Sequence, residues 1–87
     1  MIVMSNIADL LFLCEFIQYK GYYIKPHDKL INRFIEFCND RHIKINYSEK
    51  YKAFLMIQIN NETEIDQIRY LFFKELVNSK FDFDTIF

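Results

Sequence analysis

The chain has 87 residues, of which 52% are hydrophobic and 18% aromatic, and its net charge is −1. This length leaves little room for a large catalytic cleft, and the aromatic content is too high for a disordered chain. The near-zero charge gives no overall field that would attract nucleic acid or an anionic membrane. We therefore expect a single compact domain over residues 1–87, in which 80–87 form an extended C-terminal tail.

The first third of the chain predicts one helix and an extended connector. Residues 5–19 are apolar around most of a helix circumference, with Ser5 or Asn6 as N-cap and Gly21 as the stop. Residues 22–27 follow as an extended segment, since Pro26 disfavours helix at the residue before it and suits the first turn of a new helix. That second helix is expected to run to about Asp40.

The middle of the chain changes from a helical to a strand period. The second helix carries its apolar residues at three-and-four spacing, at Leu30, Ile31, Phe34, Phe37 and Cys38. Apolar and polar residues then alternate over 43–47, and residues 51–59 form a second run that is apolar on both faces. The residues 48–50 between these runs complete the pattern of a β-hairpin.

Residues 61–79 predict a third helix, with Asn61 among several possible N-caps. Its apolar stripe is Ile65, Ile68, Leu71, Phe72 and Leu76. The expected fold is therefore α+β, with three helices and one hairpin in the order α-α-β-β-α. Because a lone hairpin is marginally stable, we expect a further strand from the tail, from residues 2–4 or from a second copy of the chain.

The sequence contains no specific catalytic, cofactor or metal motif. Cys14, Cys38, His27 and His42 are the residue types of a zinc site, but their spacing is not that of known zinc motifs, and a cysteine within an apolar run usually packs in the core. Asp82 and Asp84 lack the burial that separates the pKa values of an acid and a base. We expect no enzyme activity, no cofactor and no metal.

Charge is unevenly distributed, which indicates binding surfaces. Residues 20–52 hold eight Lys or Arg against four acids, whereas residues 53–87 hold three against six. Without a signal-peptide pattern or a long apolar run, we expect a cytoplasmic protein that does not enter membranes. The leading hypothesis is a non-enzymatic protein-protein interaction module, and a homodimer is expected. Compact chains of this type are common in phages and mobile elements, where they inhibit a host protein by occupying its functional surface.

For that hypothesis, the expected contacts are aromatic anchors and an acidic end. They are Tyr22, Tyr23, Tyr51, Phe54, Asp82, Phe83, Asp84, Ile86 and Phe87. The alternative hypothesis is a single-stranded nucleic-acid-binding accessory of replication or recombination, because two segments interleave tyrosines with lysines. Its expected contacts are Lys20, Tyr22, Tyr23, Lys25, Lys50 and Lys52.

The final six residues, DFDTIF, resemble the C-terminal tip of bacterial single-stranded-DNA-binding proteins. The resemblance implies a docking peptide, in which Ile86 and Phe87 fill a pocket while Asp82 and Asp84 guide the approach. It covers under a tenth of the chain and departs from the pattern at Thr85. The alternation of Phe and Asp equally predicts a half-buried edge strand packed on the domain itself, which is the interpretation we favour for Phe81 and Phe83.

Overall fold

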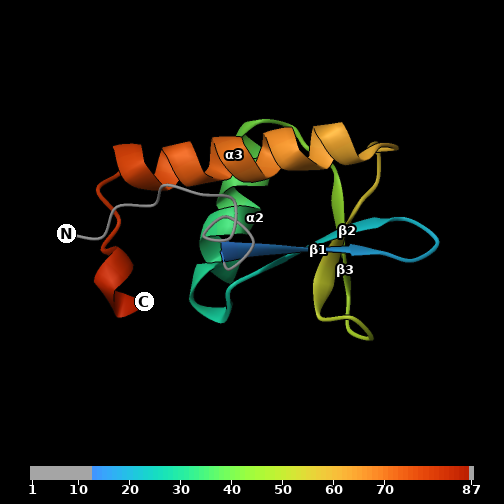
Figure 1. The fold of residues 1–87 in the computed structure, drawn as a ribbon, viewed down its shortest axis with the longest axis horizontal. Helices are drawn as coiled ribbons and strands as arrows, with labels where there is room; N and C mark the ends of the chain where they lie inside the picture. The colour runs from blue at the N-terminus through green and yellow to red at the C-terminus, as the bar shows by residue number, and fades with distance from the viewer. Residues whose placement is uncertain (1–12, 87) are drawn as a thin grey trace.

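The computed structural model describes residues 13–86, and within this range the chain forms one antiparallel sheet packed on one face against two α-helices (Figure 1). The strand order is β1-β2-β4-β3, so two hairpins meet where β2 pairs with β4. The elements are β1 (Cys14–Gln18), β2 (Tyr22–Pro26), α2 (Ile31–Asp40), β3 (Ile45–Ser48), β4 (Ala53–Met56) and α3 (Glu62–Asn78), with 3-10 turns at Asp28–Leu30 and Phe83–Thr85.

The main difference from the sequence analysis lies at β1. The helix predicted over 5–19 is wrong for its second half, because residues 14–18 form a strand that pairs with β2. Residues 5–12 lie outside the described range. Gly21, expected to end a helix, instead closes a three-residue hairpin loop, and Pro26 ends β2 rather than starting a helix. The described residues therefore contain two α-helices and a second hairpin in place of the three predicted helices.

The other predicted elements are confirmed. The hairpin of β3 and β4 pairs Tyr47 with Phe54. Helix α2 buries the predicted residues Phe34 and Cys38. Helix α3 begins after Asn61, whose side-chain oxygen accepts a hydrogen bond of 2.9 Å from the Glu64 amide. In α3 the apolar period and the capping residue agree with one another, and in α2 and the hairpin the apolar period alone was enough to predict the element.

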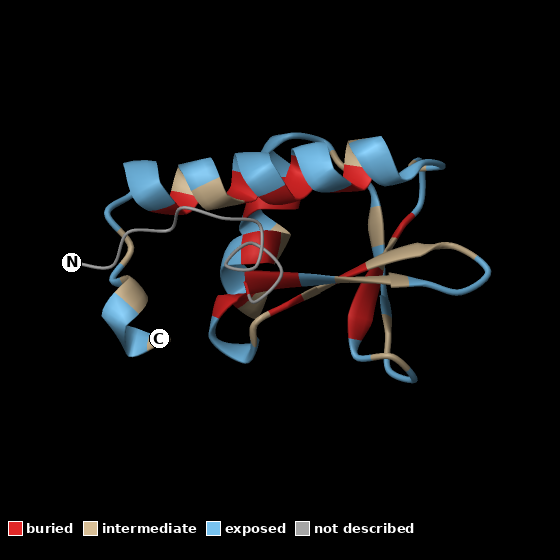
Figure 2. Ribbon diagram, in the orientation of Figure 1, coloured by how far each residue is buried: buried red, intermediate tan, exposed pale blue. Residues whose placement is uncertain are grey.

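A cluster of phenylalanine rings joins both helices to the sheet. The buried residues lie where α2, α3 and the strands face one another (Figure 2). The ring centroid of Phe34 lies 5.2 Å from that of Phe72 on α3 and 5.6 Å from that of Phe54 on β4. One predicted core residue of α3, Leu71, is 40% exposed. Arg69 takes a place on the buried side instead, at 6% exposed, and donates a hydrogen bond of 3.1 Å to the carbonyl oxygen of Cys14.

The tail does not form the predicted strand. Beyond the last residue of α3, Lys80 has a φ of 58°, and the Phe81 amide donates a hydrogen bond of 3.0 Å to the Leu76 carbonyl. This left-handed residue and this hydrogen bond turn the chain back after the helix. Asp82 then caps a single 3-10 turn, its side chain accepting from the Asp84 amide at 3.0 Å. The alternating aromatic and acidic residues thus build a local turn at the end of the molecule away from the sheet (Figure 1).

Candidate binding surface on the sheet

The pairing register gives the sheet an inner and an outer face. Side chains of directly paired residues point to the same side, so each row across the strands belongs to one face. The row Phe16, Ile24, Phe54 and Tyr47 includes the buried core residues Ile24 and Phe54 and faces the helices. The neighbouring row, which faces the other way, is Ile17, Tyr23, Leu55 and Asn46.

Three tyrosines and two lysines gather at this outer face. The ring centroid of Tyr51 lies 5.1 Å from that of Tyr23 and 6.0 Å from that of Tyr19. The Lys50 amino group lies 5.3 Å from the centroid of Tyr51 and 6.0 Å from that of Tyr19, and the Lys20 amino group lies 5.6 Å from the Tyr19 ring. We call these five residues the tyrosine–lysine face.

The β1–β2 loop brings Tyr19 and Lys20 to this face. Gly21 has a φ of +150°, and a Cβ atom at this position would lie 2.9 Å from Cδ1 of Leu55 and 3.7 Å from Cε1 of Tyr23. The loop backbone therefore rests directly on the outer row of the sheet. It projects at the end of the molecule opposite to the C-terminus (Figure 1).

The sequence contains two separate segments in which tyrosines alternate with lysines, and the structure brings residues of both segments together. Of the predicted nucleic-acid contacts, Lys20, Tyr23 and Lys50 belong to the tyrosine–lysine face. Lys25 lies on the same side of β2, paired with Glu15, and Lys52 is exposed next to Tyr51. Tyr22 lies on the inner side, its ring stacked on Phe16 with 5.8 Å between centroids.

Sequence reasoning missed Tyr19 as a site residue, because it was assigned to the end of a helix. Tyr19 is 52% exposed, which makes it one of the most accessible large hydrophobic residues among those described. The signal that would have found it is the short QYKGYY stretch. A glycine three residues after a strand-like segment and directly before another is typical of a hairpin loop, where aromatic side chains are readily exposed.

The residues that were predicted to contact a protein partner lie in different parts of the fold. Tyr23 and Tyr51 lie on the outer face, but Phe54 is 4% exposed and forms part of the core. Tyr22 faces the helices. The tail residues lie at the opposite end of the molecule from the tyrosines, so the two groups do not form one continuous surface (Figure 1). Phe87 lies outside the described residues.

The tail residues that are described pack on this chain. Phe81 and Phe83 have ring centroids 5.3 Å apart, and Phe83 lies 6.1 Å from Phe73 of α3. The guanidinium of Arg33 lies 5.0 Å from the Phe81 ring, and the Lys29 amino group donates to the Thr85 carbonyl at 2.8 Å. Ile86 also contacts the core cluster. The packing expected for Phe81 and Phe83 is thus present, in a turn rather than a strand.

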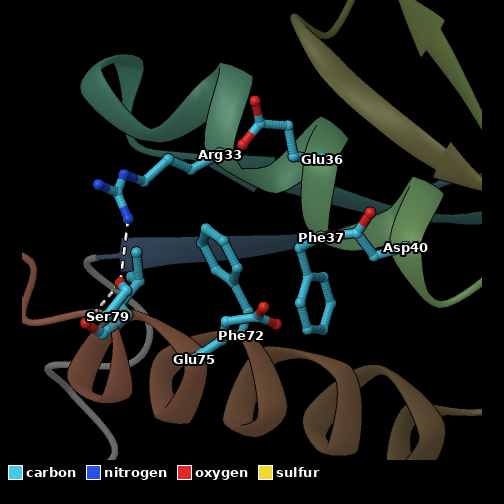
Figure 3. A pocket seen from close by; sticks show the side chains of 8 residues that line it. Arg33, Glu36, Phe37, Asp40, Phe72, Glu75 and Ser79 are labelled. Atoms are coloured by element: carbon cyan, nitrogen blue, oxygen red, sulfur yellow. Dashed lines mark hydrogen bonds between the residues drawn. The ribbon is translucent and has the colours of Figure 1, made fainter.

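A hollow between α2 and α3 is lined by charged side chains and one hydroxyl. A space of about 200 Å³ lies between α2 and α3, with Phe37 and Phe72 at its centre (Figure 3). Ser79 is its one hydroxyl; it accepts a hydrogen bond of 3.1 Å from Arg33 and donates one of 3.1 Å to the Leu76 carbonyl. The Ser79 hydroxyl donates its proton to a carbonyl and not to one of the carboxylates that line this space, so this geometry is not that of an activated nucleophile.

The two cysteines are buried and free, as expected for core residues. Burial raises the pKa of Cys38 to about 12 and raises the pKa of Cys14 still further, although Arg69 near Cys14 acts in the opposite direction. Both thiols therefore stay protonated at neutral pH, whereas a nucleophile or a metal ligand needs the thiolate. Within residues 13–86, no three His, Cys, Asp or Glu side chains are grouped closely enough to hold a metal ion.

The sequence matches no family model, and comparison with curated proteins and with solved structures gives no match. Of the helices in the described part of the chain, none has both the length and the apolar character needed to cross a membrane.

Proposed function

We propose that the protein acts by binding another macromolecule, and that the tyrosine–lysine face is its contact surface. The observation that carries this proposal is the convergence of three tyrosine rings from two hairpins on the side of the sheet that faces away from α2 and α3. Tyrosines are enriched among residues that dominate binding energy, because they offer large rigid surfaces with a polar end.

The neighbouring groups support the same role. Ile17 and Leu55 provide partly exposed apolar surface in the same row as Tyr23, and the Lys20 and Lys50 amino groups lie over the Tyr19 and Tyr51 rings. A small domain that binds in this way can inhibit its partner simply by covering the partner's functional surface, which is the action proposed for a phage or mobile-element protein of this type.

Affinity capture from a lysate of the source organism tests this proposal. The wild-type protein is compared with Tyr19→Ala/Tyr51→Ala and with the control Tyr70→Ala. Tyr70 is as exposed as Tyr19 but lies on α3. Eluted proteins and nucleic acids are both quantified, with and without nuclease. The expected result is that a bound species is lost with the double variant alone; a full set of bound species retained by that variant would refute the proposal.

Self-association is a separate proposal, based on the apolar composition of the chain. Sedimentation velocity on the same three proteins tests it. A homodimer formed through the tyrosine–lysine face should dissociate in the double variant and persist in the Tyr70→Ala control. A wild-type protein that sediments as a monomer at all concentrations would contradict the proposal.

A further inference from the structure

We infer that the ligand of the tyrosine–lysine face is a single-stranded nucleic acid, with bases stacked on the tyrosines and phosphates held by the lysines. This inference rests on the proposed function and names the class of its partner. It follows from the chemistry that the fold brings together at one place: accessible aromatic rings, and ammonium groups within 6.0 Å of the ring centroids.

The aromatic part of the site suits unpaired bases. Tyr19, Tyr23 and Tyr51 form a continuous group of rings, with neighbouring centroids 5.1 and 6.0 Å apart. Every base has a flat π-face, so such platforms bind single strands without strict sequence preference. Each stacked base typically contributes about 5- to 150-fold to affinity, and three adjacent rings predict a site of roughly three or four nucleotides.

The cationic part supplies contacts to the backbone. Lys20 and Lys50 lie next to the rings, and Lys25 and Lys52 belong to the same two hairpins. The acids of these hairpins are Glu15, which faces Lys25, and Glu49 in the β3–β4 turn. The balance of four lysines against two acids gives local positive charge on a chain whose net charge is −1. A modest number of phosphate contacts is therefore expected.

A single strand fits this surface better than a duplex or a protein. Stacking on tyrosine requires bases that are not already stacked inside a duplex, and no helix of the described residues projects from this face to enter a major groove. In protein interfaces, lysine is depleted where tyrosine is enriched. Here the lysines lie directly beside the rings, which is the combination expected of a site that binds alternating phosphates and bases.

The experiment measures the anisotropy of fluorescein-labelled dT15 and of a labelled 15-base-pair duplex as the full-length protein is added. The wild type should bind dT15 more tightly than the duplex. With two to four phosphates neutralised, affinity for dT15 should fall by about 7- to 50-fold between about 50 and 200 mM NaCl. Tyr19→Ala/Tyr51→Ala should lower affinity by at least about 5-fold, and Lys20→Gln/Lys50→Gln should both lower affinity and reduce the salt dependence.

The chain offers a matched control for both variants. Tyr70 is 52% exposed, as Tyr19 is, and the Lys74 amino group lies 5.7 Å from its ring centroid, but this pair lies on α3. Tyr70→Ala/Lys74→Gln should leave binding of dT15 unchanged. Circular dichroism of each variant shows whether it is folded. If the tyrosine variant does not fold, the lysine variant, whose substituted side chains are at the surface, tests whether this face binds dT15.

Three results would overturn the inference. They are an absence of dT15 binding at low salt, equal affinity for the duplex, and an equal loss of affinity in the α3 control. If dT15 does not bind but a nuclease-resistant protein partner is still lost with Tyr19→Ala/Tyr51→Ala, the ligand is a protein and the proposed function stands. If the face variants lose no bound species of any kind, both proposals fail.

Discussion

The β1–β2 loop rests on the sheet through Gly21, and replacing this residue with alanine tests that arrangement. Its φ of +150° is a conformation that residues with a side chain rarely adopt, and the added Cβ would lie 2.9 Å from Cδ1 of Leu55. Gly21→Ala should therefore destabilise the protein for two separate reasons, one in the backbone and one in the contact.

The expected size of the effect follows from these two terms. A residue held in a sparsely populated backbone region costs about 1–3 kcal/mol. Cδ1 is the end of a flexible side chain, so Leu55 can move aside at about 0.5–1.5 kcal/mol by leaving its preferred rotamer. The sum is about 1.5–4.5 kcal/mol, a large part of the roughly 4–13 kcal/mol expected for a domain of this size.

Urea unfolding followed by far-ultraviolet circular dichroism measures this change. With a slope of about 1.5 kcal/mol per M, a loss of 3 kcal/mol lowers the midpoint by about 2 M. The two terms are separated by repeating Gly21→Ala in a Leu55→Ala background, where only the backbone cost should remain. A Gly21→Ala protein within about 0.5 kcal/mol of the wild type would refute the reasoning, since the loop would then not be held in this conformation.

Two further predictions concern buried groups. Arg69→Met should lower the free energy of unfolding by about 1–3 kcal/mol, because the buried Cys14 carbonyl loses its hydrogen bond. Asp66→Asn should lower it by under about 1 kcal/mol, because the Asp66 side chain is half-exposed. Equal losses for the two variants in urea unfolding would contradict this prediction. Because the pKa of Cys38 is raised from 9.0 to about 12, the unfolded chain releases this proton first. Cys38 should therefore contribute a fall in stability of up to about 1.4 kcal/mol per pH unit above pH 9, and Cys14, whose pKa is also raised, should add a fall of its own. Urea unfolding between pH 8 and 10.5 measures this fall, and a Cys38→Ala protein with the same slope would contradict the assignment.

Local sequence was enough for the elements whose apolar residues repeat with one clear period. Helix α2 and the hairpin of β3 and β4 were predicted correctly because the apolar residues of each repeat with the period of that element. Residues 14–18 have no single period, since Phe16 lies on the inner side of the sheet and Ile17 on the outer side. The glycine that follows them, Gly21, can end a helix or close a hairpin loop. A short run that is apolar on every side does not distinguish a helix from a strand, and the choice depends on the partner strand.

The candidate site could not be predicted from local sequence either, because it depends on a contact between residues far apart in the chain. The sequence identified two segments rich in tyrosine and lysine, but their meeting depends on the pairing of β2 with β4, which joins Tyr23 to Leu55 across 32 positions of the chain. No local pattern specifies that contact. Tyr19 was not predicted as a site residue for the same reason. Its exposure depends on the β1–β2 hairpin, which could not be predicted from the apolar run before it.

The pairing of β2 with β4 also couples the proposed site to the core. Only two residue pairs join these strands, and they point to opposite faces: Ile24 with Phe54 lies inside, and Tyr23 with Leu55 lies outside. A shift of one residue in this register would exchange the two rows and expose the core residues. The burial of Ile24 and Phe54, at 0% and 4% exposed, therefore fixes where Tyr23 lies against Tyr51. In this chain the hydrophobic core itself positions the binding surface, so changes at Phe54 should alter ligand binding although its ring is buried.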